Sequence, residues 1–476
     1  MSESELLDLI VGCRKGSVVA PAGCGKTEQI ARAALHGRNR RLILTHTLAG
    51  VDALRSRFRS KGASSGEHEV NTIAAWSLRI AGAFPIRSSI SVSMPSGDEW
   101  ELVYAAAEKL ITAGCIKSVL TSSYSGVFVD EYQDCTQLQH KLICALADIL
   151  PCCIFGDPLQ AIFDFNGDMP DWDHEVLKIF PTIFALEHPY RWHKVGNALL
   201  GDWLLDCRRT LEQGKPIDLQ SAPRTVYHRK LQAVGKNERY QEKTKFVIQA
   251  LARSRVDKCI VIGDSRNENI RAALARKVWA TAIEPVTCKR LTAFVDELNS
   301  AEGFDRLEVT LDFMKSIMLK AQAAPLKKTV QNITLGKRRQ KPLNELESCC
   351  LDITRSNSLS PILDLLQKVP LQGGGWIYRR ELYYCICGAL QDTILGLQPS
   401  LADAVWDVQN RRRHSGRRLG NRNIGSTLLV KGLEFDHAIV VDLDTFRRND
   451  LYVALTRGSQ TLTVISESPL LHPRHS

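Results

Sequence analysis

The stretch VVAPAGCGKTEQI, residues 18–30, sets the architecture expected for this chain. Two β-branched residues run into a loop of proline and glycine, and the residues after Lys26 and Thr27 have helical composition. A strand, a glycine loop and a helix in this order form a phosphate cradle, in which the lysine reaches the β and γ phosphates and the threonine hydroxyl ligates Mg²⁺. We therefore expect a nucleoside triphosphate and Mg²⁺ here, held by Ala20, Gly23, Cys24, Gly25, Lys26 and Thr27.

Composition places the chain among ordinary soluble globular proteins. It has 476 residues, of which 44% are hydrophobic and 24% charged, and this length accommodates about two to four domains. No signal peptide or apolar run of membrane-spanning length is evident, so we expect a cytoplasmic protein with no membrane partner. The 14 cysteines lack the spacing of a zinc site, and a net charge of +10 is compatible with a polyanionic partner.

Short apolar runs recur along the chain and predict an α/β fold. They occupy residues 41–47, 126–131, 152–157, 258–264 and 437–442, with helix-length amphipathic segments between them. Strands buried on both faces have this composition, which predicts open parallel sheets. Each run ends in polar residues, and ligands of open α/β sheets bind beyond the carboxyl ends of the strands. We therefore expect the chemistry at these ends.

Two core domains are expected, with a boundary near residue 185. The second core is interrupted between about 270 and 420, where the pattern turns helical. This interruption carries basic clusters, a Gly373-Gly374-Gly375 turn and an arginine-rich stretch at 411–422. The arginine-rich stretch fits a solvated linker and a phosphate-contacting segment equally well. The whole interruption predicts an inserted subdomain.

Two adjacent carboxylates end the run at 126–131. In VFVDEYQD, one of Asp130 and Glu131 can hold Mg²⁺ while its neighbour polarises the attacking water. A solvated turn would explain an isolated pair of acids, but the phosphate loop upstream gives this pair a partner. In IFGDPLQAIFDF, Gln160 can hydrogen-bond both a γ-phosphate and a water. Phe163 is equally consistent with core packing and base stacking, and Phe165 is the better stacking candidate.

Aromatic and cationic residues follow in the second half of the chain. LEHPYRW offers Tyr190 for a base and Arg191 for phosphate charge, and Glu434 lies just before the last of the apolar runs. Arg457 ends a short apolar segment. A single arginine is usually a solvated surface residue. Two arginines that face a phosphate loop from a second domain would instead stabilise transition-state charge and make hydrolysis depend on domain closure.

In this order, the stretches resemble the superfamily 1A DNA helicases, the group of UvrD, Rep and PcrA. The resemblance rests on APAGCGKT, THTLAGVDALRSRF, NTIAAWSLRI, VDEYQDCTQLQ, FGDPLQAIFDF, LEHPYRW, STLLVKGLEFD and LYVALTR. It implies an α/β protein with two RecA-like P-loop domains, parallel sheets and compact, mainly helical insertions. The first domain would span residues 1–185, with a small insertion at about 80–122. The second would span 186–270 and 421–476, with a helical insertion at 271–420.

The resemblance implies a DNA helicase or translocase that moves 3′ to 5′ on single-stranded or tailed DNA and hydrolyses ATP between its two domains. The residues implied to be catalytic are Lys26, Asp130, Glu131, Gln160, Arg191 and Arg457. Thr27 and Asp130 would hold Mg²⁺, and Tyr190 and Glu434 would contact the nucleotide. The positions that match or neighbour DNA contacts of the family are Thr45, Thr72, Trp76 and Phe165.

The chain departs from the family pattern mainly at base and DNA contacts. The glutamine that reads adenine upstream of the phosphate loop is missing, which puts preference for ATP in doubt. Residues 73–75 are Ile, Ala and Ala where Phe, His and Ser are usual, and Asn166 and Leu428 replace arginine and histidine. These changes leave the hydrolytic residues intact, so ATP hydrolysis is a firmer expectation than strand separation.

The short insertions point to an alternative function. Short UvrD-like chains resemble helicase subunits encoded beside OLD-family nucleases, as in the Gabija anti-phage system. The alternative is therefore a regulatory ATPase subunit that binds a partner nuclease and unwinds DNA weakly or not at all. A scaffold that binds nucleotide without turnover is disfavoured because the hydrolytic residues are all present.

Overall fold

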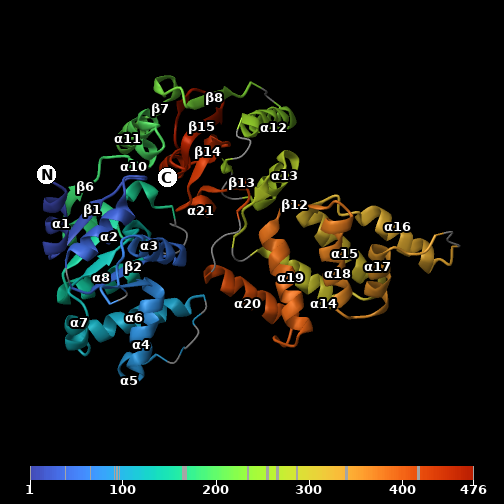
Figure 1. The fold of residues 1–476 in the computed structure, drawn as a ribbon, viewed down its shortest axis with the longest axis horizontal. Helices are drawn as coiled ribbons and strands as arrows, with labels where there is room; N and C mark the ends of the chain where they lie inside the picture. Colours follow the sequence, from blue (N-terminus) through green and yellow to red (C-terminus); the bar gives the residue numbers. More distant parts are fainter. Residues whose placement is uncertain are drawn as a thin grey trace.

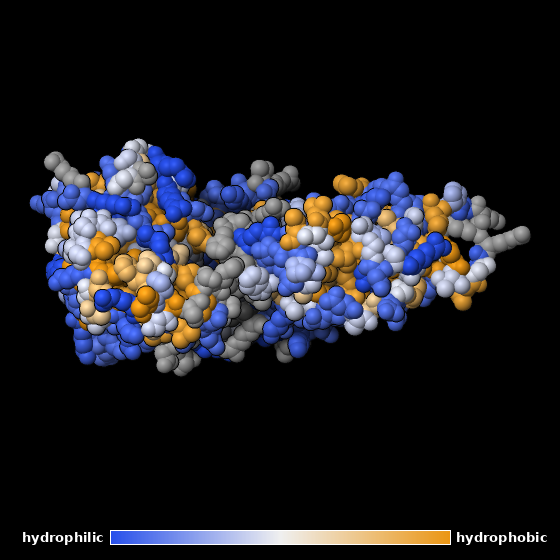
Figure 2. All heavy atoms as spheres, turned by 90° about the horizontal axis from the view of Figure 1, so that it is seen from below, coloured by the Kyte–Doolittle hydropathy of each residue, from blue (hydrophilic) through white to orange (hydrophobic). Residues whose placement is uncertain are grey.

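The computed structural model describes residues 2–37, 39–64, 66–90, 92, 95, 97–162, 169–232, 235–253, 257–263, 267–285, 288–337, 341–414 and 419–474. Figure 1 shows two bodies built around sheets and, beyond the second, an arm of helices. Seen from below in Figure 2, the molecule is elongated, and hydrophilic and apolar residues are interspersed over the broad end and the arm.

The first sheet has six parallel strands in the order β3-β2-β4-β5-β1-β6. The strands are β1 (Lys15–Val19), β2 (Arg41–Thr45), β3 (His68–Thr72), β4 (Val127–Val129), β5 (Cys152–Gly156) and β6 (Thr182–Ala185). Successive residues of β5 enter different hydrophobic cores, with Cys152 and Ile154 on one face and Cys153 and Phe155 on the other. This alternation over a fully buried strand explains why the sequence shows a continuous apolar run.

Helices cover both faces of the first sheet. The helices that pack on one face are α1 (Glu3–Gly12), α2 (Lys26–His36) and α3 (Leu48–Ser60). Those on the other side are α4 (Ile73–Ala83), α5 (Pro85–Ser88), α6 (Glu99–Thr112), α7 (Lys117–Ser123), α8 (Gln137–Ile149) and α9 (Leu177–Ile179). Ile80, Leu110 and Leu120 belong to one core with Leu42 and Val127 of the sheet. The segment expected as a small insertion at about 80–122 therefore shares its core with the first sheet.

The second sheet also has six parallel strands, in the order β10-β13-β9-β14-β15-β8. Its strands are β8 (Val226–Lys230), β9 (Cys259–Ile262), β10 (Thr281–Ala282), β13 (Arg422–Gly425), β14 (Phe435–Val440) and β15 (Gly458–Ser466). The helices around it are α10 (Tyr190–Lys194), α11 (Ala198–Glu212), α12 (Lys236–Arg253), α13 (Glu268–Val278), α21 (Thr427–Val430) and α22 (Arg448–Leu455). A short antiparallel pair, β7 (Ile217–Asp218) and β16 (Leu470–Leu471), lies beside it.

The helical arm has its own hydrophobic core, which runs from Cys288 to Val405. Its helices are α14 (Lys289–Ser300), α15 (Gly303–Ile317), α16 (Ala323–Thr334), α17 (Glu345–Arg355), α18 (Ser360–Gln372), α19 (Arg380–Ile394) and α20 (Leu401–His414). An antiparallel pair, β11 (Met318–Leu319) and β12 (Trp376–Ile377), lies where the arm meets the second sheet. Because β10 and the buried side of α13 belong to the second sheet, that unit continues past the boundary expected at residue 270.

The expected fold class is confirmed: the protein is α/β, with two RecA-like parallel sheets and a compact, mainly helical insertion. The strands follow four of the apolar runs closely, with β2 at 41–45, β4 at 127–129, β5 at 152–156 and β9 at 259–262. Within the described residues, no helix is both long enough and apolar enough to cross a membrane.

Candidate active site

The phosphate loop lies between β1 and α2 and is closely packed. Gly23 and Gly25 have φ angles of 73° and 84°, in the left-handed region that favours glycine. A Cβ atom at Gly23 would lie 2.5 Å from the ring of Trp192, and one at Gly25 would lie 3.3 Å from the ring of Tyr190. Both positions therefore require glycine, and the loop is packed against α10.

Lys26, the first residue of α2, is held by the two carboxylates that follow β4. Its Nζ lies 3.2 Å from Asp130 Oδ1 and 2.5 Å from Glu131 Oε2. Glu131 has a φ of 54°, a conformation that costs a non-glycine residue energy and is frequent at functional sites. This backbone turn lets two consecutive carboxylates reach the same ammonium group.

The charges of this cluster set its protonation. Burial opposes ionisation of Glu131, but the charges of Lys26 and Lys431 outweigh it and lower the pKa of Glu131 to about 2. Burial raises the pKa of Asp130 against the attraction of Lys26, and the neighbouring Glu131 raises it further. The pKa of Lys26 is raised because the attraction of both carboxylates exceeds the effect of burial. Glu131 and Lys26 are therefore charged at neutral pH.

Gln160 is fixed by a buried hydrogen-bond network. Its Nε2 donates to Asp157 Oδ2 at 2.9 Å, and Arg208 Nη2 of α11 lies 3.0 Å from Asp157 Oδ1. The backbone N–H of Asp157 donates to Gln133 Oε1 at 3.0 Å, and Gln133 Nε2 donates to Glu131 Oε2 at 2.6 Å. The network connects the end of β5 to the carboxylate pair at the end of β4.

The two expected arginines lie on the second-sheet side of this cluster. Arg191 donates through Nη1 to the carbonyl of Thr456 at 2.8 Å and pairs through Nη2 with Glu434 Oε1 at 2.6 Å. Arg457 is fully buried and donates to the carbonyls of Val453 and Leu433 at 2.9 Å and 3.3 Å. Burial, reinforced by the nearby Arg191, lowers the pKa of Arg457 to about 10, so the guanidinium stays charged at neutral pH.

Residues of the second sheet reach across to the first. Lys431 Nζ lies 2.5 Å from Asp134 Oδ1 and donates to the carbonyl of Gln160 at 2.5 Å. Burial raises the pKa of Asp134 to about 6, against the attraction of Lys431. Tyr452 Oη accepts a hydrogen bond from the backbone N–H of Ala22, in the phosphate loop, at 3.1 Å. The two sheets are therefore joined directly at the carboxylate cluster and at the loop.

Sequence reasoning gave no role to four members of this arrangement. Asp134, Lys431 and Tyr452 lie inside the quoted stretches VDEYQD, LLVKGLEFD and LYVALTR, so their place in these motifs was an available signal. Arg208 stands beside Arg209 in α11, outside every quoted motif, and carried no such signal. Tyr190 begins α10 with a half-exposed ring close to Gly25, and Glu434 precedes β14 and pairs with Arg191.

Of the residues expected to contact DNA, Thr45 and Thr72 lie side by side at the ends of β2 and β3, and both are buried. The side chain of Thr45 is buried at the end of β2, and the hydroxyl of Thr72 accepts a hydrogen bond from Ala75 N at the start of α4. Trp76 is fully buried in the core of the first sheet, so its ring offers no free face for base stacking and that expectation is not supported. Phe165 lies outside the described residues, as do Phe163 and Asn166.

The residues present fit a nucleotide and Mg²⁺. The glycine loop would provide the backbone N–H groups of a phosphate cradle, and the buried ammonium of Lys26 lies at its helix end. The hydroxyl of Thr27 and the carboxylate of Asp130 are oxygen donors of the kind that Mg²⁺ prefers. The donor set matches the expected cofactors without any additional residue.

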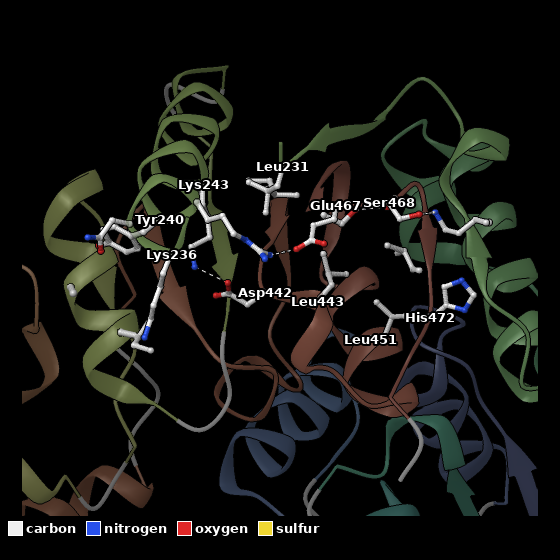
Figure 3. Close-up of a pocket in the computed structure, with 18 residues that line it drawn as sticks. Leu231, Lys236, Tyr240, Lys243, Asp442, Leu443, Leu451, Glu467, Ser468 and His472 are labelled. Carbon is white, nitrogen blue, oxygen red and sulfur yellow. Dashed lines mark hydrogen bonds and ion pairs between the residues drawn. The ribbon is translucent and has the colours of Figure 1, made fainter. Parts of the chain in front are cut away.

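A separate cavity of about 740 Å³ lies beyond the carboxyl ends of β8, β14 and β15. Figure 3 shows its lining from α12 and the C-terminal part of the chain. The Nζ of Lys243 lies 2.6 Å from Asp442 Oδ1, and Arg239 pairs with Glu467. Two of the cationic side chains in the lining, Lys243 and Arg239, are therefore paired with carboxylates.

One segment of the chain is similar to a helicase domain. Residues 97–172, which contain the carboxylate pair and Gln160, match the family model of the UvrD/REP helicase N-terminal domain. No curated protein matches the chain.

Two solved structures of an Arterivirus helicase, nonstructural protein 10, are similar to the chain. The complex with DNA has a TM-score of 0.35 and 10% sequence identity and covers 96% of this chain and 62% of that one. The structure reported without DNA has a TM-score of 0.31 and 10% identity, with coverages of 96% and 61%. The chain thus spans about three fifths of the length of these structures. The match over residues 97–172, together with the loop between β1 and α2 and the two sheets, supports a helicase-type ATPase.

Proposed function

We propose that this protein is an ATP-dependent helicase or translocase that moves 3′ to 5′ on single-stranded DNA. The observation that carries the proposal is the ion-pair cluster of Lys26, Asp130 and Glu131, which faces charged residues of a second sheet. The phosphate-binding loop lies where the two sheets contact each other. Nucleotide binding there can therefore change the relative position of the sheets. Such a change is what a motor requires.

The roles of the residues follow from their contacts. Bound ATP with Mg²⁺ supplies the phosphoryl group that is transferred to water. Glu131, ionised at neutral pH, would accept the hydrogen bond that orients that water, and Asp130 and Thr27 would hold the metal. Gln160 keeps a fixed orientation because Asp157 accepts from its amide. Lys26, Arg191 and Arg457 supply positive charge where negative charge develops.

Coupling between the sheets follows from the contacts between them. Lys431 contacts both Asp134 and the carbonyl of Gln160, so a shift of the second sheet moves a charge next to the hydrolytic residues. Tyr452 contacts the phosphate loop itself. We expect these contacts to rearrange during each cycle of ATP binding and hydrolysis, which would step the two sheets along a strand.

The test is ATP hydrolysis by the purified chain with and without single-stranded DNA, together with unwinding of a duplex that carries a 3′ tail. Stimulation by DNA and unwinding from the 3′ tail, but not from a 5′ tail, are the expected results. Absence of hydrolysis under all conditions would contradict the proposal. CTP, GTP and UTP should be tested in parallel because no glutamine precedes the loop to read adenine.

The alternative is a regulatory ATPase subunit of a nuclease complex, acting in anti-phage defence with an OLD-family partner. The observation that favours it is the burial of Trp76, which removes one of the expected DNA contacts while the hydrolytic cluster is intact. Hydrolysis that is not stimulated by DNA, with no unwinding, would favour this alternative. A nuclease activity that appears only when a partner is added would then establish it.

A further inference from the structure

An exposed tryptophan ends helix α13 in an unusual backbone conformation. Trp279 has φ 55° and ψ 47°, and its N–H donates to the carbonyl of Ala275. This left-handed position at a helix end normally holds glycine or asparagine because a larger residue is strained there. The ring of Trp279 is nevertheless 49% exposed. Packing in the hydrophobic core therefore does not explain why tryptophan, with the largest side chain, occupies this strained position.

A second tryptophan meets this ring from the helical arm. Trp376 begins β12 and pairs with Leu319 of β11, and its ring centroid lies 5.1 Å from that of Trp279 at an interplanar angle of 52°. Lys320, next to Leu319, places its Nζ 6.0 Å from the centroid of the Trp279 ring. The ring of Tyr378 is nearly parallel to that of Trp376, with the centroids 6.4 Å apart and an interplanar angle of 21°.

The turns that hold the two rings are also strained. Lys320 and Gln322 have φ angles of 54° and 52°, so two further non-glycine residues adopt the left-handed conformation beside Trp279. Gln322 Nε2 donates to the carbonyl of Gly373 at 3.2 Å, which ties this turn to the glycine turn that precedes Trp376. Strained backbone that persists in one place indicates a functional constraint.

Two exposed cations lie near the rings, Lys320 beside Trp279 and Arg276 in the last turn of α13. Burial raises the pKa of Tyr378, Arg379 and then Arg276 oppose that rise, and Glu284 adds to it. Neither of the two exposed cations forms an ion pair with a carboxylate in the part of the chain that the structure describes. Paired aromatic rings with unpaired cations beside them are the elements of a base-stacking site on single-stranded nucleic acid.

We infer that Trp279, Trp376 and Lys320 form a site where one base of a single-stranded nucleic acid stacks, at the junction of the second sheet and the helical arm. The inference rests on the proposed function and adds a contact outside the nucleotide cleft. A site here would connect the arm to the strand that the motor sheets move on. A polypeptide partner could also use exposed tryptophans, but the flanking cations favour a polyanion.

The first experiment compares the binding of fluorescein-labelled oligothymidylate to the full chain and to three variants. Trp279→Gly removes the ring, and the chain should still fold because glycine adopts this φ without strain. Trp279→Phe keeps a smaller ring. Trp406→Ala is the matched control, because the ring of Trp406 in α20 is 51% exposed. ATP hydrolysis without DNA should stay unchanged in all three variants.

We expect the affinity for oligothymidylate to fall about 5- to 150-fold in Trp279→Gly, which is the range that loss of one stacked base gives. Trp279→Phe should recover part of this loss, and Trp406→Ala should bind like the wild type. Equal binding by Trp279→Gly and the wild type would overturn the inference but not the proposed function. No binding by the wild type would instead remove the proposed function.

A second measurement detects the contact directly. Oligothymidylate that carries one 5-iodouracil should cross-link to the peptide that contains Trp279 when irradiated, and mass spectrometry identifies the residue. Cross-linking confined to other peptides would overturn the inference. Loss of binding to a polypeptide partner in Trp279→Gly, with oligothymidylate affinity retained, would likewise overturn it and assign the rings to a protein interface.

Discussion

The two sheets share the same size and parallel order, but they hold their functional residues in different ways. On the first sheet, the side chains of Lys26 and Glu131 are 11% and 30% exposed and are held mainly by one another. On the second, Arg457 and Tyr452 are 2% and 1% exposed, and Arg457 is held by backbone carbonyls. The groups of the first sheet can exchange partners when a ligand enters, whereas those of the second are fixed.

We infer from this difference that the two sheets have different roles at the site. A lysine and a carboxylate that neutralise each other can each turn to a phosphate or a water without leaving a buried charge unpaired. An arginine locked by carbonyls cannot turn, so its effect depends on where its whole sheet sits. We therefore expect residues of the first sheet to bind the nucleotide and carry out the reaction. The effect of the second-sheet residues should depend on the distance between the two sheets.

The largest expected effect comes from the fixed arginine. Arg457→Gln should lower the turnover number for ATP by about 10³-fold or more, because an arginine that stabilises transition-state charge is worth about 10³- to 10⁵-fold. Nucleotide affinity, set by the first sheet, should change little. Steady-state hydrolysis and fluorescent-nucleotide binding measure the two quantities. Arg457→Lys, which keeps the charge, should not restore turnover, and a loss below tenfold would show that Arg457 has only a structural role.

The next effect tests the exchangeable side of the comparison. Glu131→Gln should lower turnover by about 10²- to 10⁴-fold, because the amide cannot accept a proton from water. Binding of ATP should be retained or strengthened, since Lys26 loses a competing carboxylate. Because the pKa of Glu131 is lowered to about 2, the wild-type enzyme should show no loss of activity from this group at any pH above about 4. Turnover at the wild-type rate would exclude Glu131 from the reaction.

A smaller effect is expected where the two sheets meet. Asp134→Asn and Lys431→Met should each lower DNA-stimulated hydrolysis about tenfold. The double variant should be little worse than Lys431→Met alone, because that variant already removes the contact with Asp134 as well as the one with the carbonyl of Gln160. Since the pKa of Asp134 is raised to about 6, its carboxylate is ionised above that pH and protonated below it. Wild-type hydrolysis should therefore decline as the pH falls through about 6.

The control for this titration is the single variant at the same position. Asp134→Asn has no group that titrates there, so its hydrolysis should not show the decline near pH 6. Rates measured between about pH 5 and pH 8 for both proteins decide the matter. An identical decline in both proteins would assign it to another group.

Local patterns were enough to predict the sheets and to locate the loop between β1 and α2. Strand β5 was recognisable because both of its faces are buried, and the phosphate loop because its glycines adopt conformations that other residues avoid. The DNA contact predicted for Trp76 disagrees with the burial of its ring, although the sequence pattern already indicated a buried position. Ile73, Trp76 and Ile80 are spaced by three and four residues, which puts them on one face of α4, and that face is the buried one.

Other features could not be read from local patterns. The pairing of Arg208 with Asp157 joins residues far apart in the sequence and depends on how α11 packs against the end of β5. The strain at Trp279 is a backbone angle, and nothing in the run RKVWAT reveals it. Such contacts arise from tertiary packing, which composition and spacing describe only in outline.

The smallest effect tests the hydrogen bond between Tyr452 and the phosphate loop. Tyr452→Phe removes the acceptor for Ala22 N and leaves a buried donor unpaired, which typically costs about 1–3 kcal/mol. If this bond orders the loop for its ligand, the Michaelis constant for ATP should rise a few-fold while the turnover number stays within about twofold. If it instead holds the sheets together in the nucleotide-free state, the Michaelis constant should fall, because ATP no longer has to break this hydrogen bond.

Burial raises the pKa of Tyr452, so the phenol stays neutral and the comparison of the two proteins holds across the working pH range. An unchanged Michaelis constant would show that the second sheet does not act on the loop through this residue, and would leave Lys431 as the contact to examine.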